Sequence, residues 1–338
     1  MIKEDFIMKP TAGVGGEHYI PYSERTGEKS VVYFTRDLSA EGLKKIYDRV
    51  KENMTGKIGI KLHTGEPHGP NIIPRPWVEN LIKTELLEAS IVETNTYYDG
   101  GRYTTAQHLE TLKTNGWTFC SVDIMDDGEQ TVAFPVKGGK WFTEMYMGKN
   151  LENYNSLFVL THFKGHTMGG FGGSAKNIGI GCADGRIGKA MIHTVEGSAE
   201  QWSISKEEFM ERMMESAKAV VDHFGKNITF VNVLRNMSVS CDCEGTAAQP
   251  VVTPNIGIVA SLDILAVDQA SVDLVYALKD GDRKALVKRI QSRHGLRQLT
   301  YMKELGMGND RYHLIDIDND DKEITLQEAV KDVVPFKA

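Results

Sequence analysis

The sequence predicts an α/β protein built on mostly parallel sheets that are covered by helices. Segments with the β-branched and aromatic composition of strands alternate with segments whose apolar residues repeat at helical spacing. Such alternation is typical of a parallel sheet with helices on its faces. At 338 residues and 41% hydrophobic composition, the chain is also long enough to bury a large core.

The first half of the chain supplies most of this alternation. Strands are expected over residues 30–35, 57–63, 90–96 and 158–160, and helices over residues 43–50, 75–90 and 104–116. The carboxyl ends of parallel strands meet at one edge of a sheet, and ligand sites gather there. The loops after His63, Thr96 and Thr161 are therefore where we expect the functional residues.

The second half continues with longer helices. Ser205 and Glu208 predict a capping box for a helix that ends at Gly225. Further strands are expected over residues 228–234, 255–261 and 312–318, and further helices over 268–278 and 283–305. We predict two lobes around a cleft, an N-terminal α/β lobe of residues 1–224 and a C-terminal α/β lobe of residues 225–338.

Net charge and composition limit the classes of binding partner that we expect. The net charge of -7 argues against a general nucleic-acid or anionic-membrane surface. The start has no apolar region of signal-peptide length, and no later run approaches the roughly 20 apolar residues of a membrane span. Four cysteines are too few for a disulfide framework. We expect a cytoplasmic protein with reduced thiols and a small-molecule partner, and the sequence does not predict its oligomeric state.

Residues 161–189 form a stretch rich in glycine, histidine and lysine. Glycines at this density let backbone N–H groups point into a cavity, and cations beside them suit carboxylate or phosphate. We predict that a small anionic substrate or cofactor is bound by Lys164, Gly172, Gly173, Asn177, Arg186 and Lys189. Gly170, Gly172 and Ala175 match the dinucleotide pattern G-x-G-x-x-A, but "SAKNIGIG" is a poor helix start, which argues against a nucleotide fingerprint.

Three histidines are candidate acid–base residues. His63 ends an expected strand, and His162 and His166 follow another. Histidine is the side chain that accepts protons near neutral pH and is a common metal ligand, while a hydrogen-bonded structural role is the alternative. Because neighbouring lysines disfavour the imidazolium form by like-charge repulsion, we expect a neutral imidazole that can act as a base.

Cys241 and Cys243 follow the strand expected over residues 228–234. Two thiols with one residue between them can both reach one metal ion, or close only a strained disulfide. A complete zinc site or cluster needs further ligands, from Cys120, Cys182 or histidines brought in by the fold. The alternative is a structural turn with buried thiols, since cysteine is among the most buried residue types.

Three blocks of the sequence together resemble the domain-of-unknown-function 362 family, whose members are often labelled uncharacterised iron–sulfur centre proteins. The blocks are "VYFTRDLSAEGL" with "KIGIKLHTGE", then "HFKGHTMGGFGGSAKNIGIGCA", then "CDCEGTAAQPVVTPNIGIVASLDILAVDQASVDLV". Many relatives carry a ferredoxin insertion with C-x-x-C-x-x-C runs between the second and third blocks. Here that interval, from about His193 to Val233, has no cysteine. The electron-transfer role of such relatives is therefore not carried over.

A second resemblance is more distant. "HTMGGFGGSAK" is similar to the H-x-x-A-G-x-x-G-G-R-K stretch of the nickel-pincer lactate racemase family. That resemblance implies two α/β lobes around a cleft, a lysine that carries a pyridinium-derived cofactor, matched here by Lys176, and a metal-binding histidine, matched by His193. Ala175 departs from the pattern by replacing its arginine, and Asn177 follows the lysine.

These observations predict a cationic cleft that binds a small anionic organic molecule or cofactor. The candidate catalytic residues are His63, His162, His166 and Lys176, and the candidate metal ligands are Cys241, Cys243 and His193. The cofactor is not identified by the sequence, and a metal ion is one alternative. Two other functions stay open, an iron–sulfur or other metal-binding redox protein that uses the cysteine pair, and a non-catalytic sensor or carrier of a small ligand.

Overall fold

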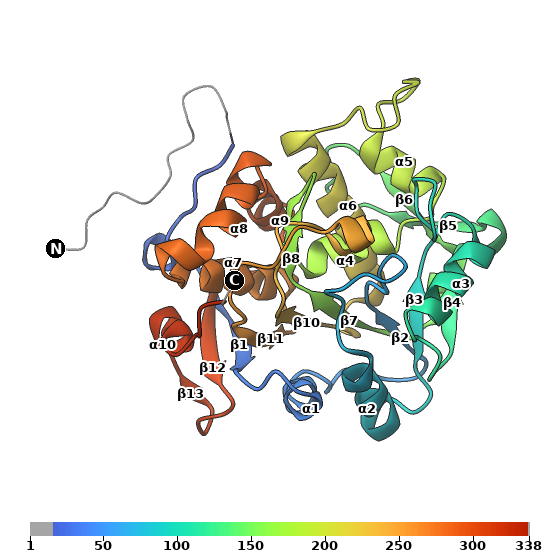
Figure 1. Ribbon diagram of the computed structural model, residues 1–338. Coiled ribbons are helices and arrows are strands. Elements are labelled where there is room, and N and C mark those ends of the chain that lie inside the picture. The colour runs from blue at the N-terminus through green and yellow to red at the C-terminus, as the bar shows by residue number, and fades with distance from the viewer. Residues whose placement is uncertain (1–15, 337–338) are drawn as a thin grey trace.

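A nine-stranded sheet forms the centre of the molecule in the computed structural model, which describes residues 16–336 (Figure 1). The strands lie in the order β13–β12–β1–β11–β10–β7–β2–β3–β4. Their bounds are β1 Lys29–Thr35, β2 Ile58–Lys61, β3 Ser90–Glu93, β4 Val122–Ile124, β7 Ser156–His162, β10 Ile228–Leu234, β11 Gly257–Ser261, β12 Arg311–Asp316 and β13 Lys322–Glu323. The predicted α/β class with a mostly parallel sheet is confirmed.

Strand direction gives the sheet one functional edge. Five neighbouring strands, β10, β7, β2, β3 and β4, are parallel to one another. β1 and β12 form a second parallel pair. β11 is antiparallel to both β10 and β1, so it alone reverses between the two parallel groups. The carboxyl ends of β2, β3, β7 and β10 consequently lie side by side at one edge of the sheet.

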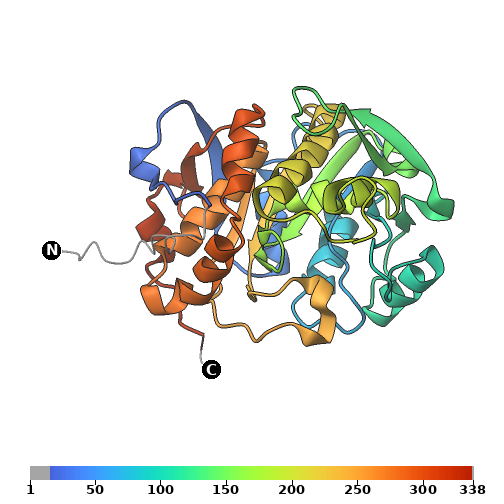
Figure 2. The ribbon, with the colours of Figure 1, turned by 90° about the horizontal axis from the view of Figure 1, so that it is seen from above.

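Helices cover both faces of the sheet. Their bounds are α1 Ala40–Asp48, α2 Arg75–Glu85, α3 Thr105–Thr114, α4 Ser174–Gly181, α5 Ile187–His193, α6 Lys206–Phe224, α7 Ile264–Ala277, α8 Asp280–Ser292, α9 Arg297–Glu304 and α10 Leu326–Val330. α1 and α2 lie on one face, below the sheet in Figure 1, and α4 to α9 form a layer on the other, seen from above in Figure 2.

Each face has its own apolar core, because successive side chains of a buried strand point to opposite faces. On β7, Phe158 and Leu160 belong to the core under α1 and α2, whereas Leu157 and Val159 belong to the larger core under α4, α6 and α7. All four side chains are fully buried. This two-sided burial explains why β7 reads as a continuous apolar run in the sequence.

Two small hairpins accompany the sheet. β5 (Thr131–Pro135) pairs with β6 (Glu144–Gly148), and β8 (Lys164–His166) pairs with β9 (Gly170–Gly172). The second hairpin follows β7 directly and so holds the glycine-rich stretch at the carboxyl edge. Gly170, at its far end, has φ +78°, a left-handed conformation that glycine adopts without strain.

The expectation that "SAKNIGIG" does not start a helix is wrong, because α4 begins at Ser174. The buried Asp268 carboxylate of α7 accepts hydrogen bonds from the backbone N–H groups of Ser174 (2.7 Å) and Ala175 (2.9 Å). A side chain 93 residues away therefore caps this helix, which local sequence does not reveal. The carboxylate also occupies the helix N-terminus, where a dinucleotide phosphate would lie.

Two further expectations about helices need correction. Ser205 is the N-cap of α6, but its side chain makes no capping hydrogen bond, so the predicted capping box does not form. The single helix expected over residues 283–305 is two helices, α8 and α9, separated where His294 adopts φ +58°. A β-carbon makes that backbone conformation unfavourable inside a helix.

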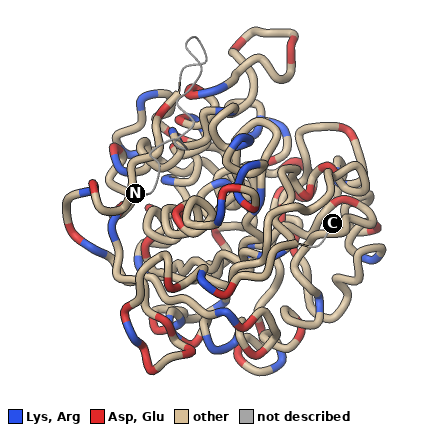
Figure 3. Tube along the Cα trace, turned by 60° about the vertical axis from the view of Figure 1, so that its left-hand side comes forward, with Lys and Arg blue, Asp and Glu red and all other residues tan. Residues whose placement is uncertain are grey.

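Figure 3 shows the positions of the charged residues along the backbone of the described part of the chain. Lysine and arginine alternate with aspartate and glutamate along the chain trace in Figure 3. Among the helices of residues 16–336, none combines the length and the apolar character that a bilayer crossing demands. The lobe boundary near residue 225 stays a prediction, and the sheet takes strands from both sides of it.

Candidate functional site

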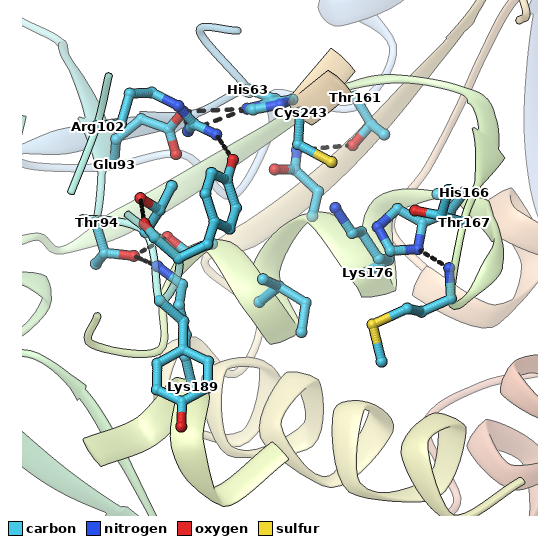
Figure 4. Close-up of a pocket in the computed structure, with 18 of the residues that line it drawn as sticks. His63, Glu93, Thr94, Arg102, Thr161, His166, Thr167, Lys176, Lys189 and Cys243 are labelled. Carbon is cyan, nitrogen blue, oxygen red and sulfur yellow. Dashed lines mark hydrogen bonds and ion pairs between the residues drawn. The ribbon is translucent and has the colours of Figure 1, made fainter. Parts of the chain in front are cut away.

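A cavity of about 330 Å³ lies at the carboxyl edge of the sheet, where β2, β3 and β7 end (Figure 4). Its volume falls in the range of small-molecule sites. The lining residues come from the strand ends, the β8–β9 hairpin, α4 and α5. They include Lys61, His63, Glu93, Tyr97, Arg102, His162, Lys164, His166, Met168, Gly172, Gly173, Lys176, Asn177, Ile180, Lys189, His193, Trp202 and Cys243.

The cavity wall is cationic although the whole chain is acidic. Five lysine and arginine side chains line it, whereas Glu93 is the one carboxylate among the described residues of the lining. Two of these cations, Lys61 and Arg102, are partly neutralised by Glu93, at 2.7 and 3.8 Å. Lys176 and Lys189 have no carboxylate within ion-pair distance among the described residues, so they leave positive charge facing the cavity.

His63 lies between an acceptor and a donor. Its Nδ1 is 3.6 Å from Glu93 Oε1 and 3.5 Å from a guanidinium nitrogen of Arg102. Its Nε2 is buried and has no hydrogen-bond partner among residues 16–336. If Nδ1–H faces Glu93, Nε2 keeps a lone pair, and if Nδ1 accepts from Arg102, Nε2 carries the proton. The surroundings thus allow either role for the ring nitrogen on the cavity wall.

Glu93 organises this end of the cavity. Its carboxylate accepts hydrogen bonds from Lys61 Nζ (2.7 Å) and from the backbone N–H of Thr64 (2.9 Å). Burial alone would raise its pKa, but Lys61, His63 and Arg102 together hold the pKa of Glu93 well below its usual value. The group is therefore an ionised, structural carboxylate that fixes the ring of His63.

His162 is held more completely than His63. Its Nδ1 lies 2.8 Å from Asp242 Oδ2, and its Nε2 lies 2.7 Å from the carbonyl oxygen of Arg235. Because both ring nitrogens face acceptors, neither lone pair is free to take a proton from a ligand. Lys164 donates to the same Asp242 oxygen at 2.9 Å. Although burial opposes it, these two cations hold the pKa of Asp242 well below its usual range.

His166 is oriented by the turn that follows it. Its Nδ1 accepts hydrogen bonds from the backbone N–H groups of Gly169 (2.8 Å) and Met168 (3.3 Å), so the ring proton lies on Nε2. Burial is the main cause that lowers the pKa of His166, and the charge of Lys176 lowers it further. The like-charge effect expected from the sequence has the predicted direction but is the smaller of the two causes.

The two cysteines differ in position and in chemistry. Cys243 lines the cavity, while Cys241 is fully buried beneath it. The Cys243 thiol, as a hydrogen-bond donor, lowers the pKa of Cys241 well below its usual value, and Lys176 and His166 act in the same direction. The same interaction raises the pKa of Cys243. Lys176 Nζ lies 3.9 Å from Cys241 Sγ (Figure 4 shows Lys176 beside His166).

Lys189 and His193 project from α5. Burial lowers the pKa of Lys189 to about 8, although its amine donates to Thr94 Oγ1 at 2.8 Å and to the carbonyl oxygen of Asn95. Burial likewise lowers the pKa of His193 to about 3. His193 Nδ1 donates to the carbonyl oxygen of Lys189 at 2.7 Å, which leaves a lone pair on Nε2.

One side of the cavity is apolar and aromatic. Tyr97, Trp202 and His193 contact one another, with ring centroids 4.9 to 6.0 Å apart. Met168 and Ile180 add aliphatic surface to the lining. The cavity therefore combines cations with an apolar wall, as expected for an organic ion rather than a free inorganic one.

The structure brings together residues that the sequence separates by more than 100 positions. His63, His162, His166, Lys176 and the other predicted residues line the same cavity, with two exceptions. Cys241 lies behind the wall, and Arg186 is not at the cavity, because its guanidinium donates to the carbonyl oxygens of Thr96 and Tyr103 and stacks on the Tyr103 ring.

Sequence reasoning missed four charged residues of the site, Lys61, Glu93, Arg102 and Asp242. Glu93 lies inside the strand expected over residues 90–96, but the observed β3 ends at Glu93, so the carboxyl-edge argument was applied three residues too late in the chain. Asp242 was treated as a spacer between two cysteines, and Arg102 lies in a loop without a pattern. The local sequence around Arg102 and Asp242 does not predict the ion pairs that these residues form with Glu66 and Lys164.

Fold and site together define an α/β protein with a ligand-sized, cation-lined cavity at the carboxyl edge of a mostly parallel sheet. The chain belongs to the family described as Domain of unknown function (DUF362), which matches residues 58–273, more than half of the sequence. The family resemblance predicted from the three sequence blocks is thereby confirmed. No curated protein matches the sequence.

The solved structures that are similar to the chain include a lactate racemase and a protein from a structural genomics programme. The lactate racemase apoprotein from Thermoanaerobacterium thermosaccharolyticum has 13% sequence identity and a TM-score of 0.36, over 90% of this chain and 86% of that chain. A Thermotoga maritima protein from a structural genomics programme has 12% identity and a TM-score of 0.33, over 58% of this chain and 50% of that one. At these values neither likeness carries an argument about function.

Proposed function

We propose that the chain is an enzyme that binds a small organic anion in the cavity and moves a proton through His63. The observation that carries this proposal is the unpartnered Nε2 of His63 in a wall with five cationic side chains and one carboxylate. A buried imidazole nitrogen without a partner costs free energy unless a ligand satisfies it. Proton transfer by a positioned histidine is a common use of such a group.

In this proposal, the anionic group of the ligand binds between Lys176 and Lys189, for which the described part of the chain supplies no carboxylate within ion-pair distance. The apolar part of the ligand packs against Tyr97 and Trp202. Glu93 and Arg102 both contact Nδ1 of His63 and hold the ring, so Nε2 is left for the substrate as a proton donor or acceptor. His162 has no free lone pair, so we assign it a positioning role for the loop that contains Asp242.

Binding can be tested before a substrate is known. Calorimetric titration would compare benzoate with benzamide, a neutral molecule of the same shape. We expect measurable binding of benzoate and binding at least roughly tenfold weaker for benzamide, because each lost charge-assisted hydrogen bond costs about 1.5–3 kcal/mol. A Lys189→Met variant should weaken benzoate binding, and a Lys113→Met variant, at an exposed helix position, should not. Equal binding of both probes would refute the anion site.

Proton transfer needs a separate readout. The protein would be incubated in D₂O with small 2-hydroxy and 2-amino acids, and proton NMR would follow loss of the C–H signal beside the carboxylate. We expect exchange for at least one acid, abolished in His63→Gln and kept in His313→Gln, a half-exposed histidine on β12. Binding without exchange or turnover would favour the sensor or carrier instead.

Lys176 and His193, the residues matched to the lactate racemase family, line the same cavity. This shared location is what supports a cofactor attached to Lys176 with a metal ion bound by His193. The hydrogen bond of His193 Nδ1 to the Lys189 carbonyl oxygen leaves a lone pair on Nε2. Intact-mass measurement of the native protein, with peptide mapping, tests this part of the proposal. Added mass on Lys176 would support it, and an unmodified lysine in active protein would exclude it.

A further inference from the structure

We propose that Cys241, Cys243 and His166 bind one borderline-soft divalent metal ion of the zinc class at the edge of the cavity. The candidate ligand atoms of these three side chains all lie within 4.8 Å of one another. The inference does not rest on the proposed anion site, because its evidence is the geometry of three different side chains.

Two chain segments are fixed against each other so that these groups meet. The β8–β9 hairpin carries His166, and the backbone N–H of Gly165 donates to the carbonyl oxygen of Ser238 at 2.7 Å. A β-carbon on Gly165 would lie 2.3 Å from the carbonyl oxygen of Val239, so only glycine permits this approach. The imidazole is thereby held against the loop that carries both cysteines.

The cysteine loop is itself ordered. Cys241 is the N-cap of the 3-10 helix Asp242–Ala247, and its sulfur accepts a hydrogen bond from the backbone N–H of Cys243 at 3.3 Å. Glu244 Oε1 accepts from the backbone N–H of Cys241 at 2.9 Å. The reciprocal cap holds both thiols on one side of the turn without a disulfide bond.

Two sulfurs and one imidazole nitrogen are a donor set that zinc-class ions prefer. Three protein ligands are typical of a catalytic rather than a structural zinc site, since the fourth position stays available. Cys243 and His166 both line the cavity, so that position would face a bound ligand. Cys120 and Cys182 lie outside the three-residue group, so the described residues do not offer four thiolates for an iron–sulfur cluster.

Binding changes the protonation of all three groups. Cys241 and Cys243 bind as thiolates, and any thiol proton that remains leaves to solvent, so a divalent ion is neutralised in this site. The proton on His166 Nε2 moves to Nδ1, so the hydrogen bond from the Gly169 N–H is lost and the 167–169 turn adjusts. Lys176, 3.9 Å from Cys241 Sγ, then donates to a metal-bound thiolate, as outer groups of metal sites commonly do.

Cobalt titration of the full-length, reduced, chelator-treated protein tests the site, because Co²⁺ reports on its ligands by absorption. We expect one equivalent to bind with sulfur-to-cobalt charge-transfer bands, and one equivalent of Zn²⁺ to displace it. Cys241→Ser and Cys243→Ser should each lower the affinity at least about 100-fold, beyond the 10–100-fold typical of outer-shell changes. Cys120→Ser, at a half-buried thiol outside the group, is the matched control.

Serine is also a good N-cap residue, so Cys241→Ser should keep the fold, which circular dichroism can verify. Cys243→Ser, at a half-buried position, provides the second variant. No cobalt binding, or binding unaffected by both cysteine variants, would overturn the proposal. His166→Gln should bind more weakly and shift the cobalt spectrum, and a spectrum and affinity identical to those of the natural chain would overturn the three-ligand assignment.

Discussion

At the scale of single residues, Glu93 is expected to stabilise the fold as the counter-charge of two buried cations at the cavity. The carboxylate is buried, pairs with Lys61 at 2.7 Å and lies 3.8 Å from Arg102. In Glu93→Gln the shape is kept but two buried cations lose their counter-charge. Removing one partner of a buried ion pair costs about 3–5 kcal/mol, and urea unfolding at pH 7 should show a loss of that size.

The control is Glu79→Gln, which removes the partner of Lys83 in an exposed pair and should cost under about 1 kcal/mol. The pH dependence follows from the lowered pKa of Glu93. A carboxyl group whose folded-state pKa is depressed stabilises the protein above its ordinary pKa of about 4.5 and loses this contribution as pH falls below it. Equal stability losses for both variants at pH 7 would contradict the ion-pair role.

Lys189 should make anion binding depend on pH. Burial lowers its pKa to about 8, so the amine is charged below that pH and neutral above it. We expect benzoate affinity to fall roughly 5- to 10-fold from pH 7 to pH 9, because the charged fraction of an amine with a pKa of about 8 falls about tenfold over that range. Calorimetry on the natural chain and on Lys189→Met would check this. The variant should bind weakly at both pH values, and a parallel decline in both proteins would assign the effect to another group.

The sequence could predict site residues at strand ends but not their ion pairs. His63 and His162 were found because parallel strands end at a common edge, and Lys176 because of a motif. Strand order makes Glu93 a partner of Lys61, since β2 and β3 are neighbours in the sheet. The local sequence pattern does not specify which strands are neighbours in the sheet. It also does not predict that Arg186 donates to backbone carbonyl groups away from the cavity.

At the scale of elements, α4 depends on a cap from another helix. The Asp268 carboxylate also accepts from Asn232 Nδ2 at 2.8 Å, in addition to two N–H groups of the α4 N-terminus. Asp268→Ala leaves these buried donors without a partner, which we expect to cost about 1–3 kcal/mol in urea unfolding. Because α4 carries Lys176 and Asn177 into the cavity, the variant should also weaken benzoate binding.

This loss should itself depend on pH. Burial raises the pKa of Asp268 to about 6 from 3.8, although three N–H donors oppose the shift. A raised folded-state pKa means that the group contributes most stability below about pH 4 and loses it as pH rises through 6. The difference between the natural chain and Asp268→Ala should therefore be roughly 1 kcal/mol larger at pH 5 than at pH 7.5. A constant difference would contradict the shift.

Most elements of the fold could be predicted from periodicity. The central strands and α1, α2, α3 and α6 are found close to their expected positions, because each has an apolar face of the right period. α4 could not be predicted, because its sequence contains Gly179 and Gly181 and begins with Ser174, and these residue types have low helix propensity. Two tertiary contacts stabilise this helix, the cap by Asp268 and the packing against α6.

At the scale of the whole molecule, the sheet ties both halves of the chain together. β1 lies between β11 and β12, and β7 pairs with β10, so strands from residues 1–224 and 225–338 are hydrogen-bonded to each other at three places along the sheet. A domain that folds alone needs its own core and few crossing contacts. We therefore expect one cooperative unfolding transition for the full chain.

The tryptophans make this expectation testable, because all of them precede residue 225: Trp77, Trp117, Trp141 and Trp202. Fluorescence thus reports on the N-terminal part, while far-ultraviolet circular dichroism reports on both. Coincident urea transitions by the two probes would show a single cooperative unit. A second dichroism transition without a fluorescence change would instead establish residues 225–338 as a separately folding lobe, and a stable, folded 1–224 fragment would lead to the same conclusion.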